Sequence, residues 1–111
     1  MSTRSWKERI EDIIDAITEI LQFTEDMTFD QFQSDNRTIK AVMTNISIIG
    51  EAARHVPGTT TSQYPEIPWL LMRSMRNRMV HAYFSIDPKI LWDTIQDDLP
   101  PLLEPLRQLL Q

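Results

Sequence analysis

Apolar residues recur at helical spacing in two long stretches of the chain. The first runs from Trp6 to Phe23 and the second from about Asp35 to His55, each with apolar side chains at steps of three and four residues. The positions are Trp6, Ile10, Ile13, Ile14, Ile17, Ile20 and Leu21, then Ile39, Val42, Met43, Ile46, Ile49, Ala53 and Val56. This spacing is typical of amphipathic helices that bury one face. We therefore predict two long helices.

Polar residues with capping chemistry stand where these helices should begin. Ser5 and Thr28 each have a Glu or Gln three residues later, which is the form of a capping box. Thr28 would open a short helical turn at residues 29–32, and Asp35 is placed to cap the second long helix. Pro57 and Gly58 should end that helix.

The second half of the chain is divided by prolines. We expect a polar loop from Thr59 to Gln63 and a helix that starts in the turn of Pro68 and frays near residues 83–85. Its apolar positions are Trp69, Met72, Met75, Met79 and Val80. Asp87 and Pro88 should begin a last helix, because Asp is a good N-cap and Pro fits the first turn.

The last helix cannot run straight to the end of the chain. Pro100, Pro101 and Pro105 must interrupt or kink it, while the leucines that follow predict a packed tail. No segment of useful length has the alternation of a strand. We therefore predict one all-α domain over residues 1–111, an antiparallel bundle of four or five helices.

Composition excludes several classes of function. The chain has no cysteine and two histidines far apart, which argues against a disulfide framework, a thiol nucleophile or a structural zinc site. No glycine-rich phosphate loop is present, so an NTPase is excluded and no cofactor is expected. The start of the chain has no signal-peptide pattern, and no apolar run is long enough to cross a membrane. We expect a cytoplasmic protein with no membrane association.

Net charge argues against broad binding to nucleic acid, since the formal charge is −5. However, three arginines fall within six residues, and no acidic residue occurs between Glu66 and Asp87. These arginines are Arg73, Arg76 and Arg78. An acidic protein with one such basic segment can still hold a short stretch of phosphates there.

The segment from Met75 to Phe84 carries residues that core and caps do not explain. On a helical wheel Asn77 and His81 lie only about 40° apart, while Arg76 lies about 140° from His81 and nearly eclipses Tyr83. RNA cleavage without a metal requires a group that activates the 2′-hydroxyl, one that protonates the leaving 5′-oxygen, and a cation for the phosphoryl charge. Histidine can serve as base or acid, and arginine binds phosphate in a fork.

One chain offers a single histidine in this segment, whereas two proton transfers call for two groups. A two-fold dimer that joins two copies of the segment would complete such a site. On spacing alone, however, a structural role for these arginines and the histidine is favoured over a catalytic one. An arginine-rich helix face is usually solvated, and a histidine near a helix C-terminus is often placed by the helix dipole. We interpret His55 as such a cap and Glu51 as a surface carboxylate.

The same residues resemble a known motif. Arg76-Asn77-x3-His81-x-Tyr83 resembles the R-x4-H-x-Y motif of HEPN-domain toxins of the HepT type. Further segments resemble that family in the same order, so the similarity covers nearly the whole chain. They are FDQFQSDNRT (29–38), IGEAARHV (49–56), YPEIPW (64–69), FSIDPKILWDTI (84–95) and DDLPPLLEPL (97–106). Relatives often have glycine or an acidic residue where this chain has Ala82.

The resemblance implies a HEPN-like helical bundle that forms a homodimer, with both motifs lining one cleft. It implies a metal-independent ribonuclease toxin in which Arg76 and His81 are catalytic and Asn77 supports them. From the basic segment itself we add Arg73 and Arg78 as supporting residues. The resemblance also implies a partner, an MntA-type nucleotidyltransferase antitoxin, which transfers AMP from ATP to Tyr83. Bulky anionic groups there would obstruct RNA.

Two other functions are compatible with the sequence. The helical dimer could be a non-catalytic module that docks a nucleotidyltransferase, or a helical regulator that binds nucleic acid. The negative charge and the lack of a helix-turn-helix pattern disfavour the regulator. For a ribonuclease, the same acidity predicts a narrow RNA footprint such as a tRNA end or loop.

Overall fold

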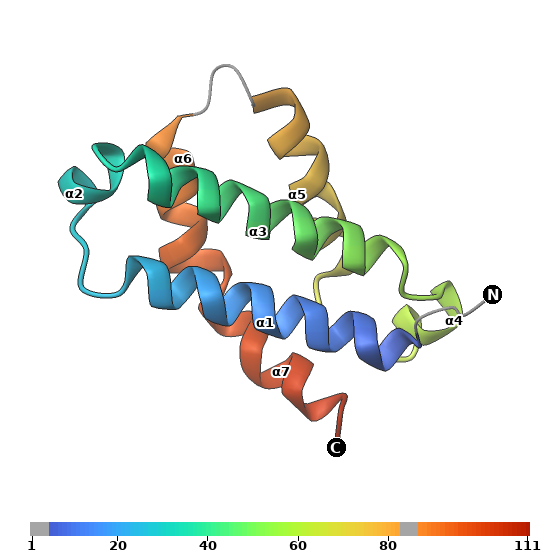
Figure 1. Ribbon diagram of the computed structural model, residues 1–111. Coiled ribbons are helices and arrows are strands. Elements are labelled where there is room, and N and C mark those ends of the chain that lie inside the picture. The colour runs from blue at the N-terminus through green and yellow to red at the C-terminus, as the bar shows by residue number, and fades with distance from the viewer. Residues whose placement is uncertain (1–4, 83–86) are drawn as a thin grey trace.

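Three long helices form the body of the protein (Figure 1). The computed structural model describes residues 5–82 and 87–111, with the side chains of residues 80–82 excepted. Helices α1 (Trp6–Thr24) and α3 (Asn36–Arg54) run antiparallel, and α5 (Trp69–Ala82) packs against α3. All regular elements within the described ranges are helical. The predicted all-α bundle is confirmed.

The predicted helix starts are confirmed by their caps. The Ser5 hydroxyl accepts a hydrogen bond from the amide of Glu8 at 3.2 Å, and Thr28 caps α2 (Phe29–Gln33) in the same way. Asp35 accepts from both the amide and the hydroxyl of Thr38, at 3.0 and 2.8 Å. These bonds, the amide first, hold the pKa of the Asp35 carboxyl below its usual value because they favour the charged form.

The core lies along the faces that the apolar spacing indicated. The buried side chains include four isoleucines of α1, the aliphatic stripe of α3 and the methionines of α5. They are Ile10, Ile13, Ile17, Ile20, Val42, Ile46, Ile49, Met72, Met75 and Met79. Trp69 is also buried, and its indole N–H donates to the carbonyl of Tyr64 at 2.9 Å. This bond satisfies the one polar group of the indole.

The segment expected to be a polar loop from Thr59 to Gln63 forms instead a short helix, α4 (Gly58–Thr61). The amides of Thr60 and Thr61 both donate to the carbonyl of Pro57, and the Thr61 hydroxyl donates to the carbonyl of Gly58 at 3.2 Å. The polar composition was misleading because the threonines bond locally to the carbonyls of Pro57 and Gly58, which closes a helical turn. Thr60 is even buried.

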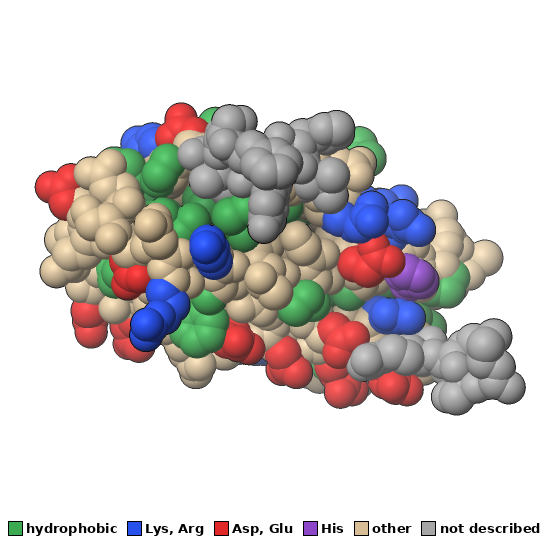
Figure 2. Space-filling model, turned by 45° about the horizontal axis from the view of Figure 1, so that its top comes forward, with side chains coloured by type: hydrophobic (Ala, Val, Ile, Leu, Met, Phe, Trp, Pro, Cys, Tyr) green, Lys and Arg blue, Asp and Glu red, His purple; other side chains and the backbone are tan. Residues whose placement is uncertain are grey.

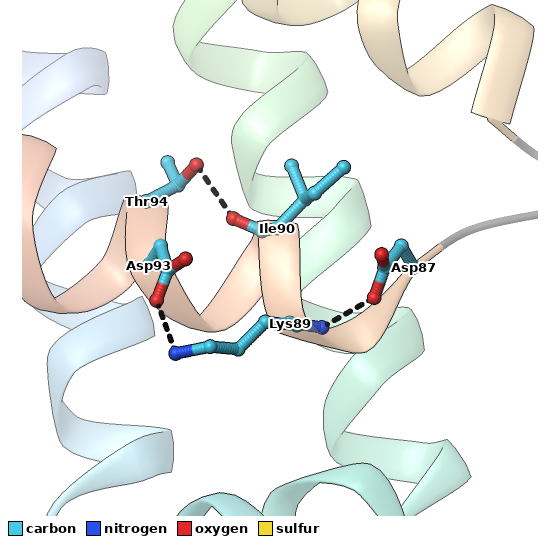
Figure 3. Close-up of polar contacts among 5 residues, drawn as sticks. All are labelled: Asp87, Lys89, Ile90, Asp93 and Thr94. Atoms are coloured by element: carbon cyan, nitrogen blue, oxygen red, sulfur yellow. Dashed lines mark hydrogen bonds and ion pairs between the residues drawn. The ribbon is translucent and has the colours of Figure 1, made fainter.

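A capped helix begins the C-terminal part, as predicted. The carboxylate of Asp87 accepts from the amide of Lys89 at 2.9 Å and so caps α6 (Pro88–Asp93). The ammonium of Lys89 in turn contacts the carboxylate of Asp93 at 2.8 Å, one turn further on (Figure 3). The hydrogen bond to Asp93 raises the pKa of Lys89 above its usual value.

Prolines distort the helix beyond α6 in the expected region. The chain widens into a π-helical turn, η1 (Thr94–Asp98), tightens into a 3₁₀ turn, η2 (Pro100–Leu102), and continues as α7 (Leu103–Gln108). Pro100 and Pro101 have no N–H to continue the α-helical pattern; they lie in η2, and η1 directly precedes them. Pro105 lies in the first turn of α7, where proline is tolerated, and does not interrupt it. The leucines of the tail pack as predicted, with Leu102, Leu106 and Leu109 buried.

Helices α3 and α5 approach each other closely at Gly50. A Cβ added at Gly50 would lie 2.5 Å from the backbone nitrogen of Arg76 and 2.7 Å from its Cβ. Real Cβ atoms do not approach backbone so closely, hence only glycine allows this helix crossing. The crossing brings the end of α3 against the arginine-rich part of α5.

The crossing predicts that Gly50→Ala is destabilising. Alanine is the better helix former by about 1 kcal/mol, yet separating the helices should lower the free energy of unfolding by a net ~1–3 kcal/mol. Urea unfolding measures this change. Gly58→Ala is the matched control, because nothing lies within 4 Å of a Cβ there. It should be neutral or slightly stabilising, and equal effects at the two positions would contradict the account.

Candidate functional site

Arg76 contacts an acidic residue where α5 crosses α3. Its Nε lies 3.0 Å from Oε2 of Glu51, and each side chain is 42% exposed. Oε2 is enclosed and has no aligned hydrogen-bond donor, so the contact is an ion pair rather than a hydrogen bond. The guanidinium therefore remains accessible to solvent while its position is tied to α3.

Glu51 is the site residue that the sequence reasoning missed. We interpreted it as a surface carboxylate, and its half-exposed side chain agrees with that, but its pairing with Arg76 was not foreseen. Gly50 was the one feature of the sequence that could have indicated this pairing. A glycine within an amphipathic helix often marks a close helix crossing, and the residue beside it then faces the partner helix.

His55 ends α3 and approaches the same carboxylate. Its Nδ1 lies 2.8 Å from the carbonyl oxygen of Glu51 and 3.6 Å from the carboxylate Oε1. A carbonyl oxygen only accepts, so Nδ1 carries the hydrogen in this contact. The interpretation of His55 as a C-terminal cap is confirmed. In addition, Glu51 lies between Arg76 on one side and His55 on the other.

The other polar residues of α5 differ in their surroundings. Asn77 is exposed, and Arg78 is exposed with Nη2 donating to the hydroxyl of Ser74 at 3.2 Å. Arg73 is half-buried, and its Nε is enclosed without a hydrogen-bond partner. Arg73 and Arg76 are three residues apart, so they lie on neighbouring turns of one helix face. Arg73 is thus a second cation near the ion pair.

Cationic side chains gather in one area of the surface. Figure 2 shows Lys and Arg side chains gathered next to a carboxylate and the histidine, with acidic side chains spread along another edge of the molecule. Exposed acidic residues of α1 include Glu11, Asp15 and Glu19. The net charge of −5 therefore conceals a local cationic area on α5.

The remaining motif residues are only partly covered by the structure. Helix α5 extends to Ala82, which places the backbone of His81 on the same helix as Arg76. The side chain of His81 and the whole of Tyr83 lie outside the described residues. The structure thus places Arg73, Arg76, Asn77 and Arg78 on one helix, while the assembly of the motif side chains into one site stays a prediction.

The described part of the chain shows neither a candidate metal site nor a candidate membrane-spanning helix. No group of three or more His, Cys, Asp or Glu side chains is arranged to hold a metal ion there. Nor is any of the described helices long and apolar enough to cross a bilayer.

Comparison with known proteins identifies the family. The model of the ribonuclease HepT-like family matches residues 13–109, which is most of the chain. The chain belongs to this family. The family assignment agrees with the all-helical bundle and with the predicted resemblance. No solved structure matches the chain.

Curated relatives of this HepT-like chain are similar over nearly their whole length. A probable ribonuclease HepT of Thermococcus cleftensis is 42% identical over 99 residues, covering 89% of this chain and 90% of the relative. A candidate RNase of Methanocaldococcus jannaschii is 35% identical over 100 residues, covering 90% of this chain and 83% of the relative. A second protein of that organism, also named as an RNase, is 32% identical over 102 residues and covers 92% and 94%.

The exposure of the ion pair predicts that it adds little stability. Because both side chains are 42% exposed, Glu51→Gln should change the free energy of unfolding by less than about 1 kcal/mol. Chemical unfolding of the variant beside the wild type measures this. A loss of several kcal/mol would show that the pair is a structural element of the helix crossing.

Proposed function

We propose that this HepT-like chain is a metal-independent endoribonuclease, the toxin of a toxin–antitoxin pair. The observation that carries the proposal is the position of Arg76, whose guanidinium is half exposed on α5 in a chain of the ribonuclease HepT-like family. Such a guanidinium can bind a phosphate with two parallel N–H donors. The proposed substrate is RNA of a restricted class, such as a tRNA end or loop. We propose that the protein acts in the cytoplasm.

The proposed reaction is attack of the RNA 2′-hydroxyl on the adjacent phosphorus. The hydroxyl loses its proton as the new O–P bond forms, and the bond to the 5′-oxygen breaks as that oxygen gains a proton. His81 supplies acid or base, because imidazole titrates near neutral pH. Arg76 stabilises the charge that develops on the phosphoryl oxygens, while Asn77 orients phosphate or imidazole and Arg73 and Arg78 hold flanking phosphates.

A homodimer completes the proposed site. Each motif has one histidine, whereas the reaction needs one group to remove a proton and another to deliver one. In a two-fold dimer the same surface of both subunits meets, so two copies of the α5 motif would line one cleft. One His81 would then act as the base and the other as the acid.

The proposed off switch is Tyr83. An MntA-type nucleotidyltransferase would transfer AMP from ATP to the phenol, forming an O–P bond with release of pyrophosphate. The added phosphodiester would place negative charge where substrate phosphate should bind. The supporting observation is the position of Tyr83 in the sequence, seven residues after Arg76 and two after His81.

Substitution at the motif tests catalysis. Arg76→Ala and His81→Ala should each lower the rate of RNA cleavage by about 10²-fold or more, the usual contribution of such groups. A time course on total tRNA measures this. Arg37→Ala is the charge-matched control, because Arg37 is exposed at the opposite end of α3. Wild-type protein without cleavage activity would favour a non-catalytic docking module instead.

Co-expression with the neighbouring nucleotidyltransferase tests the off switch. Intact-mass spectrometry should show one or more added AMP groups on the wild type and none on Tyr83→Phe. Addition of AMP to the phenylalanine variant would place the modification on another residue.

A further inference from the structure

We propose that Glu51 is a positioning residue for Arg76. Its carboxylate holds the guanidinium by the Nε side, so that the terminal nitrogens are presented to the RNA phosphate. This inference rests on the proposed function, in which Arg76 binds the reacting phosphate. The observation behind it is the ion pair of 3.0 Å between Nε of Arg76 and Oε2 of Glu51.

The contact with Glu51 leaves the two terminal nitrogens of the Arg76 guanidinium available. Arginine has five N–H donors arranged in a planar fork, and Nε supplies one of them. Within the described residues, Nε to Glu51 is the one ion pair or hydrogen bond of the Arg76 side chain. The two terminal nitrogens are therefore available for an end-on, two-bond contact with a phosphate.

Glu51 is itself held from two directions. Its backbone position is set by the crossing at Gly50, the preceding residue, where α3 approaches the backbone of Arg76 as closely as glycine permits. Its backbone carbonyl also accepts from Nδ1 of His55 at 2.8 Å, one helical turn further on. A carboxylate on a backbone placed in this way gives the long arginine side chain a defined orientation before RNA binds.

Positioning has a cost that makes the proposal testable. Orientation of a catalytic cation before the reaction lowers the barrier, because the side chain need not be ordered in the transition state. The same carboxylate, however, is an anion close to the place where phosphate binds, so it weakens RNA binding. Loss of the Glu51 charge should therefore have opposite effects on turnover and on affinity.

The experiment measures kcat and KM of the full-length protein on a short RNA that the wild type cleaves. Glu51→Gln should lower kcat about 10-fold or more without raising KM. Glu51→Asp keeps the charge but has a shorter reach, so kcat should fall less and KM should stay near the wild-type value. The control is Glu25→Gln, which changes an exposed carboxylate at the C-cap of α1 and should leave both constants unchanged.

Arg76→Lys provides a second test of the coupling. A lysine ammonium is a point charge with no planar fork for Glu51 to orient, so Glu51→Gln should cause little further loss of kcat in the lysine background. Equal losses in both backgrounds would show that Glu51 acts independently of Arg76. A rise of kcat and of affinity together in Glu51→Gln would show that the carboxylate competes with RNA for the arginine. Either result overturns the proposal.

Motion of the guanidinium gives a readout that needs no RNA. Nitrogen-15 relaxation at Nε of Arg76 should report a rigid group in the wild type and a more mobile one in Glu51→Gln. Unchanged motion overturns the positioning role whether or not the protein cleaves RNA. If the motion changes as expected but the wild type cleaves no RNA, the proposed function has failed, whereas the orientation of Arg76 by Glu51 is supported.

Discussion

The close approach of α3 and α5 at Gly50 is the constraint on which the rest of the site depends. With no Cβ at this position, the backbone of Arg76 can approach within a distance that any other residue would prevent. The crossing brings Glu51 to the guanidinium of Arg76 and leaves both side chains half exposed. A core packed on both sides of the crossing, with Ile49 and Met75 buried, holds the two helices in this arrangement.

A protein with a negative net charge can still bind RNA phosphate if its positive charges gather in one area, as the arginines of α5 do. The carboxylates exposed on α1 belong to a different helix from the arginines of α5, and negative charge on that helix repels RNA phosphates. The single carboxylate beside Arg76 is a different case, because it contacts the cation directly. We infer that affinity is limited by this anion in return for an ordered guanidinium, which agrees with a narrow RNA footprint.

Much of the fold could be predicted because its signals are local. Apolar spacing indicated the helices, and the side-chain caps at Ser5, Thr28, Asp35 and Asp87 marked where they begin. The short helix α4 was missed because its hydrogen bonds join small polar residues that also form loops. For the site, the sequence indicated Arg76. Its pairing with Glu51 joins two residues that lie 25 positions apart on different helices, which spacing along one helix does not reveal.

The central claim is that the motif on α5 cleaves RNA by means of the chain's own side chains. The most direct test incubates purified wild-type protein with a 5′-labelled RNA in excess chelator and analyses the new ends. Attack by the 2′-hydroxyl predicts cleavage at an undiminished rate, with a 2′,3′-cyclic phosphate on one product and a 5′-hydroxyl on the other. Cleavage that the chelator abolishes, or products that carry a 5′-phosphate, would contradict the account.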